Sequence, residues 1–96
     1  MREKKSPGKT DSRIMAKAFL EGSGGCENII SCCNCITRLR LEVKDPEAVD
    51  EEKLKNSGAA AVFWPSAKLL HIVIGPQVFE VAREMKELIE VQKTAL

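Results

Sequence analysis

Hydrophobic and polar positions repeat along this chain with two different periods, and each period predicts a different kind of element. In the segment TRLRLEVK, residues 37–44, the leucines and the valine occupy every second position and charged side chains lie between them. This period of two is typical of a β-strand with one covered face and one face exposed to water. The preceding segment ENIISCC, residues 27–33, is rich in β-branched and small apolar residues and predicts another strand.

Two further apolar segments predict a β-hairpin. The segment AAAVFW, residues 59–64, and the segment KLLHIVI, residues 68–74, are separated by Pro65-Ser66-Ala67. Proline and serine favour turns, because proline fixes its own φ and serine bonds to nearby backbone groups. Two strands joined by so short a connection usually pair with each other in antiparallel fashion.

Three other segments carry apolar residues at intervals of three and four, which is the spacing of an amphipathic helix. Capping residues, helix-ending glycines and a proline at the first helical position set their limits. The expected starts are Asp11 or Ser12, then Asp50 as N-cap, then Gly75-Pro76, and the expected ends are the glycines of residues 22–25, Gly58 and the polar residues after Ile89.

The resulting order α-β-β-α-β-β-α predicts an α+β fold. The simplest arrangement is a four-stranded antiparallel sheet with three helices on one face. The charged positions of residues 37–44, among them Arg38 and Arg40, would then lie on the opposite face. That face remains open for binding or chemistry.

Length and composition narrow the classes of function. The chain has 96 residues, the size of one domain, and 44% hydrophobic residues allow a modest core. Its formal net charge of +1 creates no global field that would attract nucleic acid, and no apolar run approaches the ~20 residues that cross a bilayer. The first residues, MREKKSPGKTDSR, are too charged for a secretory signal. We therefore expect a cytosolic domain whose cysteines stay reduced.

Polar stretches at the two ends set the expected domain boundaries. Residues 1–10 combine lysines with serine, proline, glycine and threonine, a composition that cannot bury apolar surface, and we expect a flexible linker. Residues 11–90 are expected to form the folded domain, and residues 91–96 a mobile C-terminal tail. Polar terminal segments of this kind are expected of a domain that was cut from a longer polypeptide.

The cysteines Cys26, Cys32, Cys33 and Cys35 fall close together and admit several interpretations. A structural zinc site is disfavoured, because its ligands usually come as two short pairs with a longer loop between them. Neighbouring residues of a strand also point to opposite faces, so Cys32 and Cys33 cannot easily share one ion. We expect no metal and no cofactor. A redox pair of Cys33 and Cys35 stays open, while Cys26 and Cys32 fit best as small core residues.

Cys35 differs from the other cysteines because it lies where the first expected strand turns into the second. Backbone N–H groups of Ile36, Thr37 and Arg38 can surround an anion on its sulfur there, and Arg38 and Arg40 add positive charge. Such surroundings favour the thiolate over the thiol, and the same donors would suit the oxygens of a phosphoryl group. The spacing of the two arginines alone is equally compatible with an ordinary solvated strand face.

The segment GGCENIISCCNCITRLRLEV, residues 24–43, resembles the active-site signature of the glucose-type enzyme IIB domains of the bacterial phosphoenolpyruvate-dependent sugar phosphotransferase system. That signature is roughly G-G-x-x-N-I-x-x-x-D-x-C-x-T-R-L-R, and the similarity to these domains extends from Ile14 to Ile89, most closely to the glucose and N-acetylglucosamine branches. The matching residues are Gly24, Gly25, Asn28, Ile29, Cys35, Thr37, Arg38, Leu39 and Arg40.

The resemblance implies a phosphocysteine carrier. Cys35 would take a phosphoryl group from a phosphohistidine of enzyme IIA and pass it to a sugar bound in the membrane IIC domain of the same polypeptide. Thr37 would lie in the phosphate-binding loop, with Arg38 and Arg40 supporting transfer and docking. The resemblance also implies a position on the cytoplasmic face of the bacterial inner membrane, with residues 1–10 similar to the linker between IIC and IIB.

One position departs from the family pattern: Cys33 replaces the aspartate that usually lies two residues before the nucleophile. A thiol offers neither the charge nor the strong acceptor of a carboxylate, so this substitution puts the transfer rate in question. Two other classes of function stay open beside the carrier. These are a regulatory binding module, with a regulatory protein as a further candidate partner, and a thiol-disulfide redox domain.

The chain has a single histidine, His71, which lies in the segment LLHIVI on the same expected strand face as Leu69 and Val73. A lone histidine at such a position is usually structural. We likewise expect Phe63 and Trp64 to serve packing, because the sugar site would belong to IIC.

Overall fold

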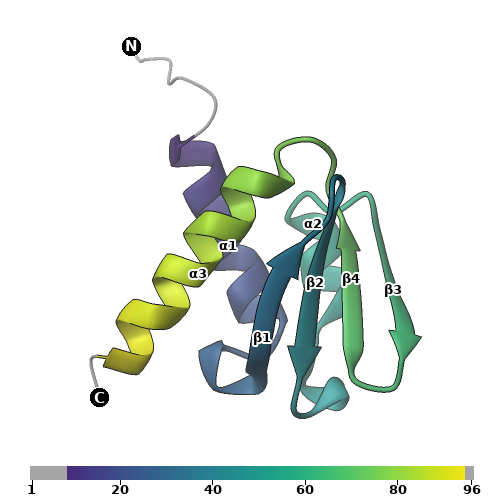
Figure 1. The fold of residues 1–96 in the computed structure, drawn as a ribbon. Helices are drawn as coiled ribbons and strands as arrows, with labels where there is room; N and C mark the ends of the chain where they lie inside the picture. Colours follow the sequence, from purple (N-terminus) through teal and green to yellow (C-terminus); the bar gives the residue numbers. More distant parts are fainter. Residues whose placement is uncertain (1–8, 95–96) are drawn as a thin grey trace.

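The computed structural model describes residues 9–94 and contains a four-stranded antiparallel sheet and three α-helices (Figure 1). The expected α+β class and element order are confirmed. No helix in this described part of the chain is long and apolar enough to cross a membrane. The elements are α1 Lys9–Gly22, β1 Ile29–Asn34, β2 Arg38–Val43, α2 Glu51–Asn56, β3 Ala61–Ser66, β4 Leu69–Val73 and α3 Val78–Thr94, with short 3-10 turns at Cys26–Asn28 and Pro46–Ala48.

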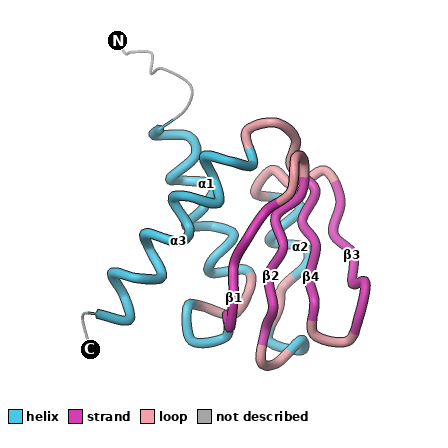
Figure 2. The backbone as a smooth tube through the Cα atoms, in the orientation of Figure 1, coloured by secondary structure: helices cyan, strands magenta, loops and turns pink. Residues whose placement is uncertain are grey.

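The strands lie in the order β1-β2-β4-β3, so β1 and β3 are the edges of the sheet. Each neighbouring pair is antiparallel, and the central pair aligns Arg40 with His71 and Leu39 with Ile72. The helices gather on one side of the sheet, where α3 contacts β1 and β2, α2 contacts β3, and α1 packs on both α2 and α3 (Figures 1 and 2). Within residues 9–94, no helix covers the other face of the sheet.

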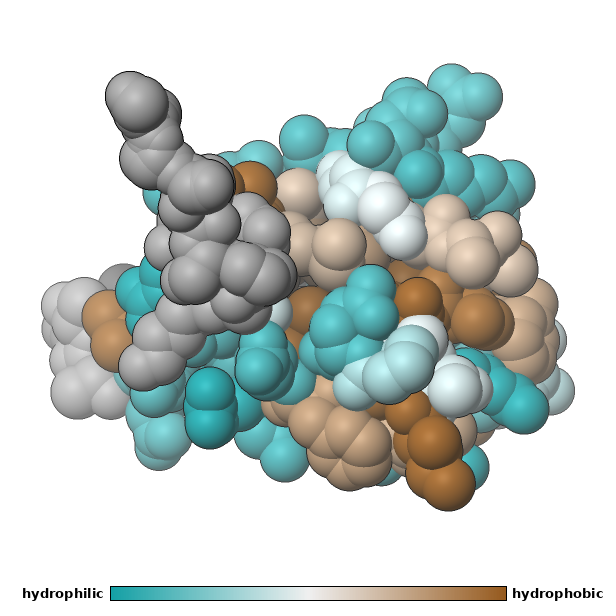
Figure 3. Space-filling model, turned by 90° about the horizontal axis from the view of Figure 1, so that it is seen from above, coloured by the Kyte–Doolittle hydropathy of each residue, from teal (hydrophilic) through white to brown (hydrophobic). Residues whose placement is uncertain are grey.

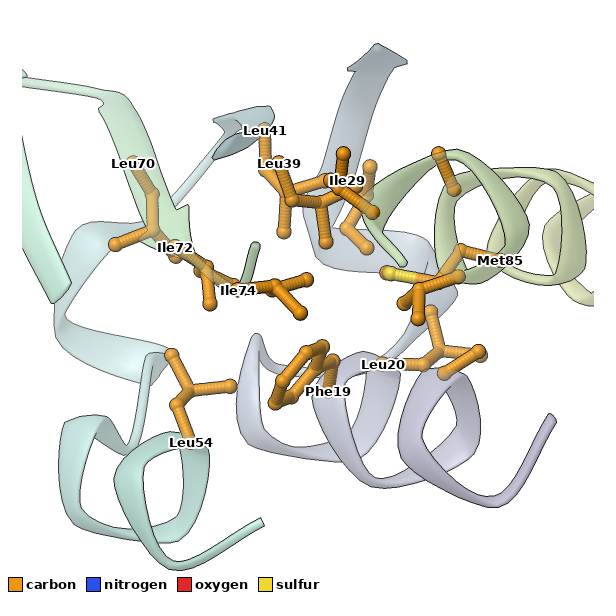
Figure 4. Packing of buried hydrophobic residues seen from close by; sticks show 14 of the residues in the cluster. Phe19, Leu20, Ile29, Leu39, Leu41, Leu54, Leu70, Ile72, Ile74 and Met85 are labelled. Atoms are coloured by element: carbon orange, nitrogen blue, oxygen red, sulfur yellow. The ribbon is translucent and has the colours of Figure 1, made fainter. Parts of the chain in front are cut away.

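The core forms between the sheet and the helices (Figure 4). Apolar side chains at every second position of the strands pack there against the apolar sides of the helices. In β2, Leu39, Leu41 and Val43 are fully buried, while Arg40 and Glu42 between them are exposed. Each buried aliphatic or aromatic side chain contributes roughly 1.5–3 kcal/mol relative to its exposed state. The other buried members are Ala16, Phe19, Leu20, Ile29, Leu54, Leu70, Ile72, Ile74, Val78, Val81, Ala82 and Met85.

The first helix begins earlier than expected. Helix α1 already begins at Lys9, so Ser12 lies inside it rather than capping it. The Ser12 hydroxyl instead donates to Glu80 Oε1 at 3.0 Å, and Arg13 Nε reaches Glu84 Oε1 at 2.9 Å. Local sequence does not reveal these contacts between α1 and α3. Residues 1–8 of the expected linker lie outside the described residues.

The C-terminal helix also differs from its expected limits. It begins at Val78, two residues after Pro76, and it continues to Thr94, beyond the helix end expected just after Ile89. Of the tail expected over residues 91–96, only the last two residues therefore lie outside the described part.

The hairpin turn lies later than expected. Strand β3 continues through Pro65 and Ser66, and the turn falls at Ala67 and Lys68. Proline is tolerated there because β3 is an edge strand and its pairing with β4 is irregular between Phe63 and Ser66.

The start of α2 is as expected. The Asp50 carboxylate accepts a hydrogen bond from the Lys53 N–H at 3.1 Å, which makes Asp50 the N-cap of this helix.

Candidate active site

Cys35 lies in the short loop of residues 35–37 that connects β1 to β2. The Cys35 N–H donates to the Arg38 carbonyl at 2.9 Å, and the Asn34 side-chain amide donates to the Cys35 carbonyl at 2.9 Å. These two bonds fix the backbone on both sides of the thiol, which stays partly exposed at the end of the sheet. The loop therefore presents the sulfur to other molecules.

The surroundings of the Cys35 sulfur favour its thiolate form. The pKa of the Cys35 thiol lies below its ordinary value of 9.0, chiefly because the backbone N–H of Thr37 bonds to the sulfur. Slight desolvation opposes this shift, and the N–H of Arg38 and the charges of Arg40 and Arg38 reinforce it. The amide of Ile36 is not among the groups that lower this pKa. Two amides and two guanidinium groups thus place hydrogen-bond donors and positive charge near the sulfur.

The same loop is tied to a distant part of the chain. The Thr37 carbonyl accepts hydrogen bonds from the N–H groups of Ile74 and Gly75, at 2.9 and 3.0 Å. Gly75 has a φ of +120°, a backbone conformation that other residues rarely adopt. The connection between β4 and α3 therefore holds the loop in place and aims the Thr37 and Arg38 amides at the sulfur.

This end of the molecule is viewed directly in Figure 3. Apolar groups are interspersed there with hydrophilic groups rather than separated from them. In the loop itself, the Ile36 side chain is 73% exposed and adds an apolar contact beside the thiol. A surface of this mixed kind suits a transient protein contact.

Both arginines lie on the open face of the sheet, as their phase predicts. Cross-strand pairing sets Cys33, Arg40, His71 and Phe63 side by side in one row across the four strands. Arg38 lies on the same face, two residues nearer the loop. The row runs from Cys33 on β1, two residues before Cys35, to Phe63 on β3 at the other edge of the sheet.

His71 and Phe63 both contact the Arg38 guanidinium. Arg38 Nη1 lies 3.4 Å from His71 Nδ1, and its Cζ lies 5.4 Å from the centre of the Phe63 ring. The rings of Phe63 and His71 meet edge to face, with centroids 5.2 Å apart. Reasoning from the sequence treated both rings as packing residues. Their alternation with the core-facing Ile72 and Trp64 signals the open face, but only the strand order reveals that they meet Arg38.

The remaining cysteines have other surroundings. Cys32 packs against the core, and burial raises the pKa of its thiol to about 11. Cys26 also packs partly against the core, whereas Cys33 is exposed on the open face. The thiols of all four cysteines are free. In the described part of the chain, no group of three or more His, Cys, Asp or Glu residues is placed to hold a metal ion.

Together, the fold and the site define a small α+β domain that presents a partly exposed cysteine with a lowered pKa in a short loop between two strands. A family model described as "phosphotransferase system, EIIB" matches residues 17–50. The N-acetylglucosamine-specific EIIB component of Streptomyces coelicolor is 38% identical over 73 residues, which is 76% of this chain and 94% of that protein. The chain therefore belongs to the EIIB family of the phosphotransferase system.

Two further similarities agree with this assignment. The maltose-specific EIICB component of Escherichia coli is 46% identical over 83 residues, covering 86% of this chain. A crystal structure of one domain of the IIabc component from Clostridium difficile has a TM-score of 0.75 and 28% identity, covering 82% of this chain and 83% of that one. This chain spans only 15% of the maltose-specific relative and 16% of the N-acetylglucosamine-specific EIICB component of Bacillus subtilis.

Proposed function

We propose that this domain is a phosphocysteine carrier in sugar uptake, with Cys35 as the residue that holds the phosphoryl group. The observation that carries the proposal is the geometry of the loop of residues 35–37, where a partly exposed thiol with a lowered pKa faces the amides of Thr37 and Arg38. Membership of the EIIB family supports the same chemistry.

The proposed reaction has two displacement steps. The Cys35 thiolate attacks the phosphorus of a phosphohistidine on a IIA protein, so a P–S bond forms as the P–N bond breaks and the histidine keeps the electron pair. A sugar hydroxyl then attacks the same phosphorus and releases its proton to a base beside the sugar, the P–S bond breaks, and the thiolate returns. The amides of Thr37 and Arg38 and the charges of Arg38 and Arg40 would stabilise the phosphoryl oxygens in both transition states.

The architecture of the relatives supports the partners that we propose. Several of them are named as EIICB or EIICBA components, in which IIB is joined to IIC or to both IIC and IIA. We infer that this domain works on the cytoplasmic face of the inner membrane, receives phosphate from a IIA domain and delivers it to sugar in a IIC domain. Relatives named for maltose, N-acetylglucosamine and glucose all match, which suits a carrier whose partner IIC selects the sugar.

The direct test is phosphorylation of the full chain by phosphorylated IIA, with the modified residue located by mass spectrometry. We expect one phosphoryl group on Cys35 in the parent and in Cys33→Ser, and none in Cys35→Ser. Phosphorylation of Cys33, or undiminished transfer to the Cys35→Ser chain, would overturn the assignment. The Cys33→Ser variant also measures how the residue in place of the family aspartate affects the rate.

The same phosphorylation experiment distinguishes a phosphocysteine carrier from a thiol-disulfide redox domain. The carrier should take up phosphate in the presence of a reductant, because its chemistry needs only the free thiol of Cys35. A redox domain would instead show a reversible disulfide between Cys33 and Cys35 and no phosphorylation.

A further inference from the structure

We propose that His71 is a positioning residue for phosphoryl transfer: its neutral imidazole accepts a hydrogen bond from Arg38 and keeps that guanidinium beside the loop of Cys35. The inference rests on the proposed function. It concerns how Arg38 is positioned and not which residue is the nucleophile. His71 itself lies on β4, two strands away from β1, and the role assigned to it runs through Arg38.

The first argument is the direction of the hydrogen bond. A guanidinium group can only donate, so His71 Nδ1, 3.4 Å from Arg38 Nη1, must accept and must carry no proton. The proton of the neutral ring then lies on Nε2, which is buried and has no hydrogen-bond partner among the described residues. Leaving a buried N–H unpaired destabilises the fold. The contact with Arg38 is therefore the hydrogen bond that the described residues offer this ring.

The second argument is the neutral state of the ring. His71 is only 7% exposed. The charged groups facing it are Arg38 and Arg40 of β2, while β3 contributes the uncharged Phe63, and its neighbours on the same face of β4 are Leu69 and Val73. Burial lowers the pKa of His71 below its ordinary 6.5, and the two arginines lower it further. The ring thus stays an acceptor at neutral pH.

The third argument is the packing that fixes the ring. Phe63 meets the His71 ring edge to face at 5.2 Å and at the same time lies 5.4 Å from the Arg38 guanidinium carbon. One aromatic ring therefore limits the movement of both partners of the hydrogen bond. The anchored guanidinium remains close enough to Cys35 for its charge to lower the pKa of that thiol.

The test compares single-turnover phosphorylation of the parent chain by phosphorylated IIA with that of His71→Phe and His71→Asn. Phenylalanine keeps the ring and removes the acceptor, whereas asparagine can return an acceptor oxygen near the position of Nδ1. We expect the maximal rate to fall about tenfold or more in His71→Phe, with half-saturation by phosphorylated IIA changed by less than about twofold. Asparagine should restore most of the rate.

Two controls separate positioning from folding. Leu69→Ala alters the same face of β4 opposite Glu42, away from Arg38, so it should lower the melting temperature without a comparable loss of rate. His71→Phe removes the unpaired buried N–H, so its melting temperature should equal or exceed that of the parent. A loss of rate in Leu69→Ala that matches the loss in His71→Phe would overturn the inference.

A double-mutant cycle tests the path through Arg38. In an Arg38→Ala background, adding His71→Phe should change the rate by less than about twofold, because the interaction is already absent. A further tenfold loss would mean that His71 acts independently of Arg38 and would refute the proposal. The ratio of parent to His71→Asn rates should also fall at acid pH, once the pH drops below the lowered pKa of His71 in the folded chain, because the ring then gains a proton and stops accepting.

These results also distinguish the two proposals. If the parent chain is not phosphorylated on Cys35, the proposed function fails. If Cys35 is phosphorylated but His71→Phe transfers as fast as the parent, only the role of His71 is refuted.

Discussion

Cys32 and Cys35 show how strongly position decides the chemistry of one residue type. Only three positions apart in the sequence, one thiol packs against the core and the other faces amide hydrogens at the end of the sheet. Burial raises the pKa of Cys32 to about 11, whereas hydrogen bonds and positive charge lower the pKa of Cys35. The two thiols should therefore differ sharply in reactivity.

Alkylation of the folded chain with iodoacetamide at neutral pH should modify Cys35 well before Cys32. At pH 7 a thiol with a pKa near 11 is only ~0.01% thiolate, and the thiolate is the reactive form. Peptide mass spectrometry over time measures the order of modification. Equal alkylation rates of Cys32 and Cys35 in the native state would contradict this prediction. As a control, the two rates should become equal in urea.

His71 should make the stability of the domain depend on pH. Its pKa is lowered in the folded chain but returns toward 6.5 on unfolding, so the unfolded state binds more protons just below that pH. The stabilisation is complete above pH 6.5 and declines as the pH falls toward the folded-state pKa. Urea unfolding of the parent and His71→Asn between pH 5 and 8 should show a decline that is steeper in the parent.

Much of the site follows from the sequence because its groups are neighbours in the chain. The thiol of Cys35, the amides of Thr37 and Arg38, and the strand face of both arginines depend only on local spacing and period. The contacts of His71 and Phe63 with Arg38 do not, because they depend on β4 lying between β2 and β3 in the sheet. Strand order is set by the packing of the whole domain, and neither ring is near Arg38 in the sequence.

Among the elements, local chemistry predicted some boundaries and tertiary contacts decided the others. The cap at Asp50 depends on a side chain bonding to its own turn, and it lies where expected. The start of α1 depends on partners in α3, such as Glu80 and Glu84, and the strand position of Pro65 depends on β3 being an edge. Such partners lie far away in the sequence, so a local pattern cannot reveal them.

A substitution in the turn between β4 and α3 should affect the loop of residues 35–37. Gly75→Ala places a Cβ at a φ of +120° and should destabilise the domain by about 1–2 kcal/mol. Strain there should also loosen the bonds from Ile74 and Gly75 to the Thr37 carbonyl, and so slow alkylation of Cys35 at neutral pH. Thermal unfolding and alkylation kinetics measure the two effects.

Gly25→Ala is the matched control for that variant. Gly25 also has a positive φ, of +89°, but it lies before β1, at the opposite end of that strand from Cys35. It should lower stability to a similar degree and leave the alkylation rate of Cys35 unchanged. An equal drop in rate for both glycines would mean that general loosening, not the turn, controls the loop.

At the scale of the whole molecule, one core between the sheet and the helices stabilises the domain. Phe19 of α1 is completely buried at its centre, whereas Ile14 of the same helix is 63% exposed. Phe19→Ala should reduce the free energy of unfolding by about 3–5 kcal/mol, and Ile14→Ala by less than about 0.5 kcal/mol. Denaturation by urea measures both. Similar losses would mean that α1 does not contribute its apolar stripe to the core.

Two hydrogen bonds converge on the Thr37 carbonyl, so the backbone amides that donate them can report on changes in the loop of residues 35–37. The amide protons of Ile74 and Gly75 lie far along the chain from Cys35, yet any tightening or opening of the loop must change their environment. Their NMR resonances and deuterium uptake should therefore report on the proposed phosphorylation of Cys35, without a probe attached to that residue.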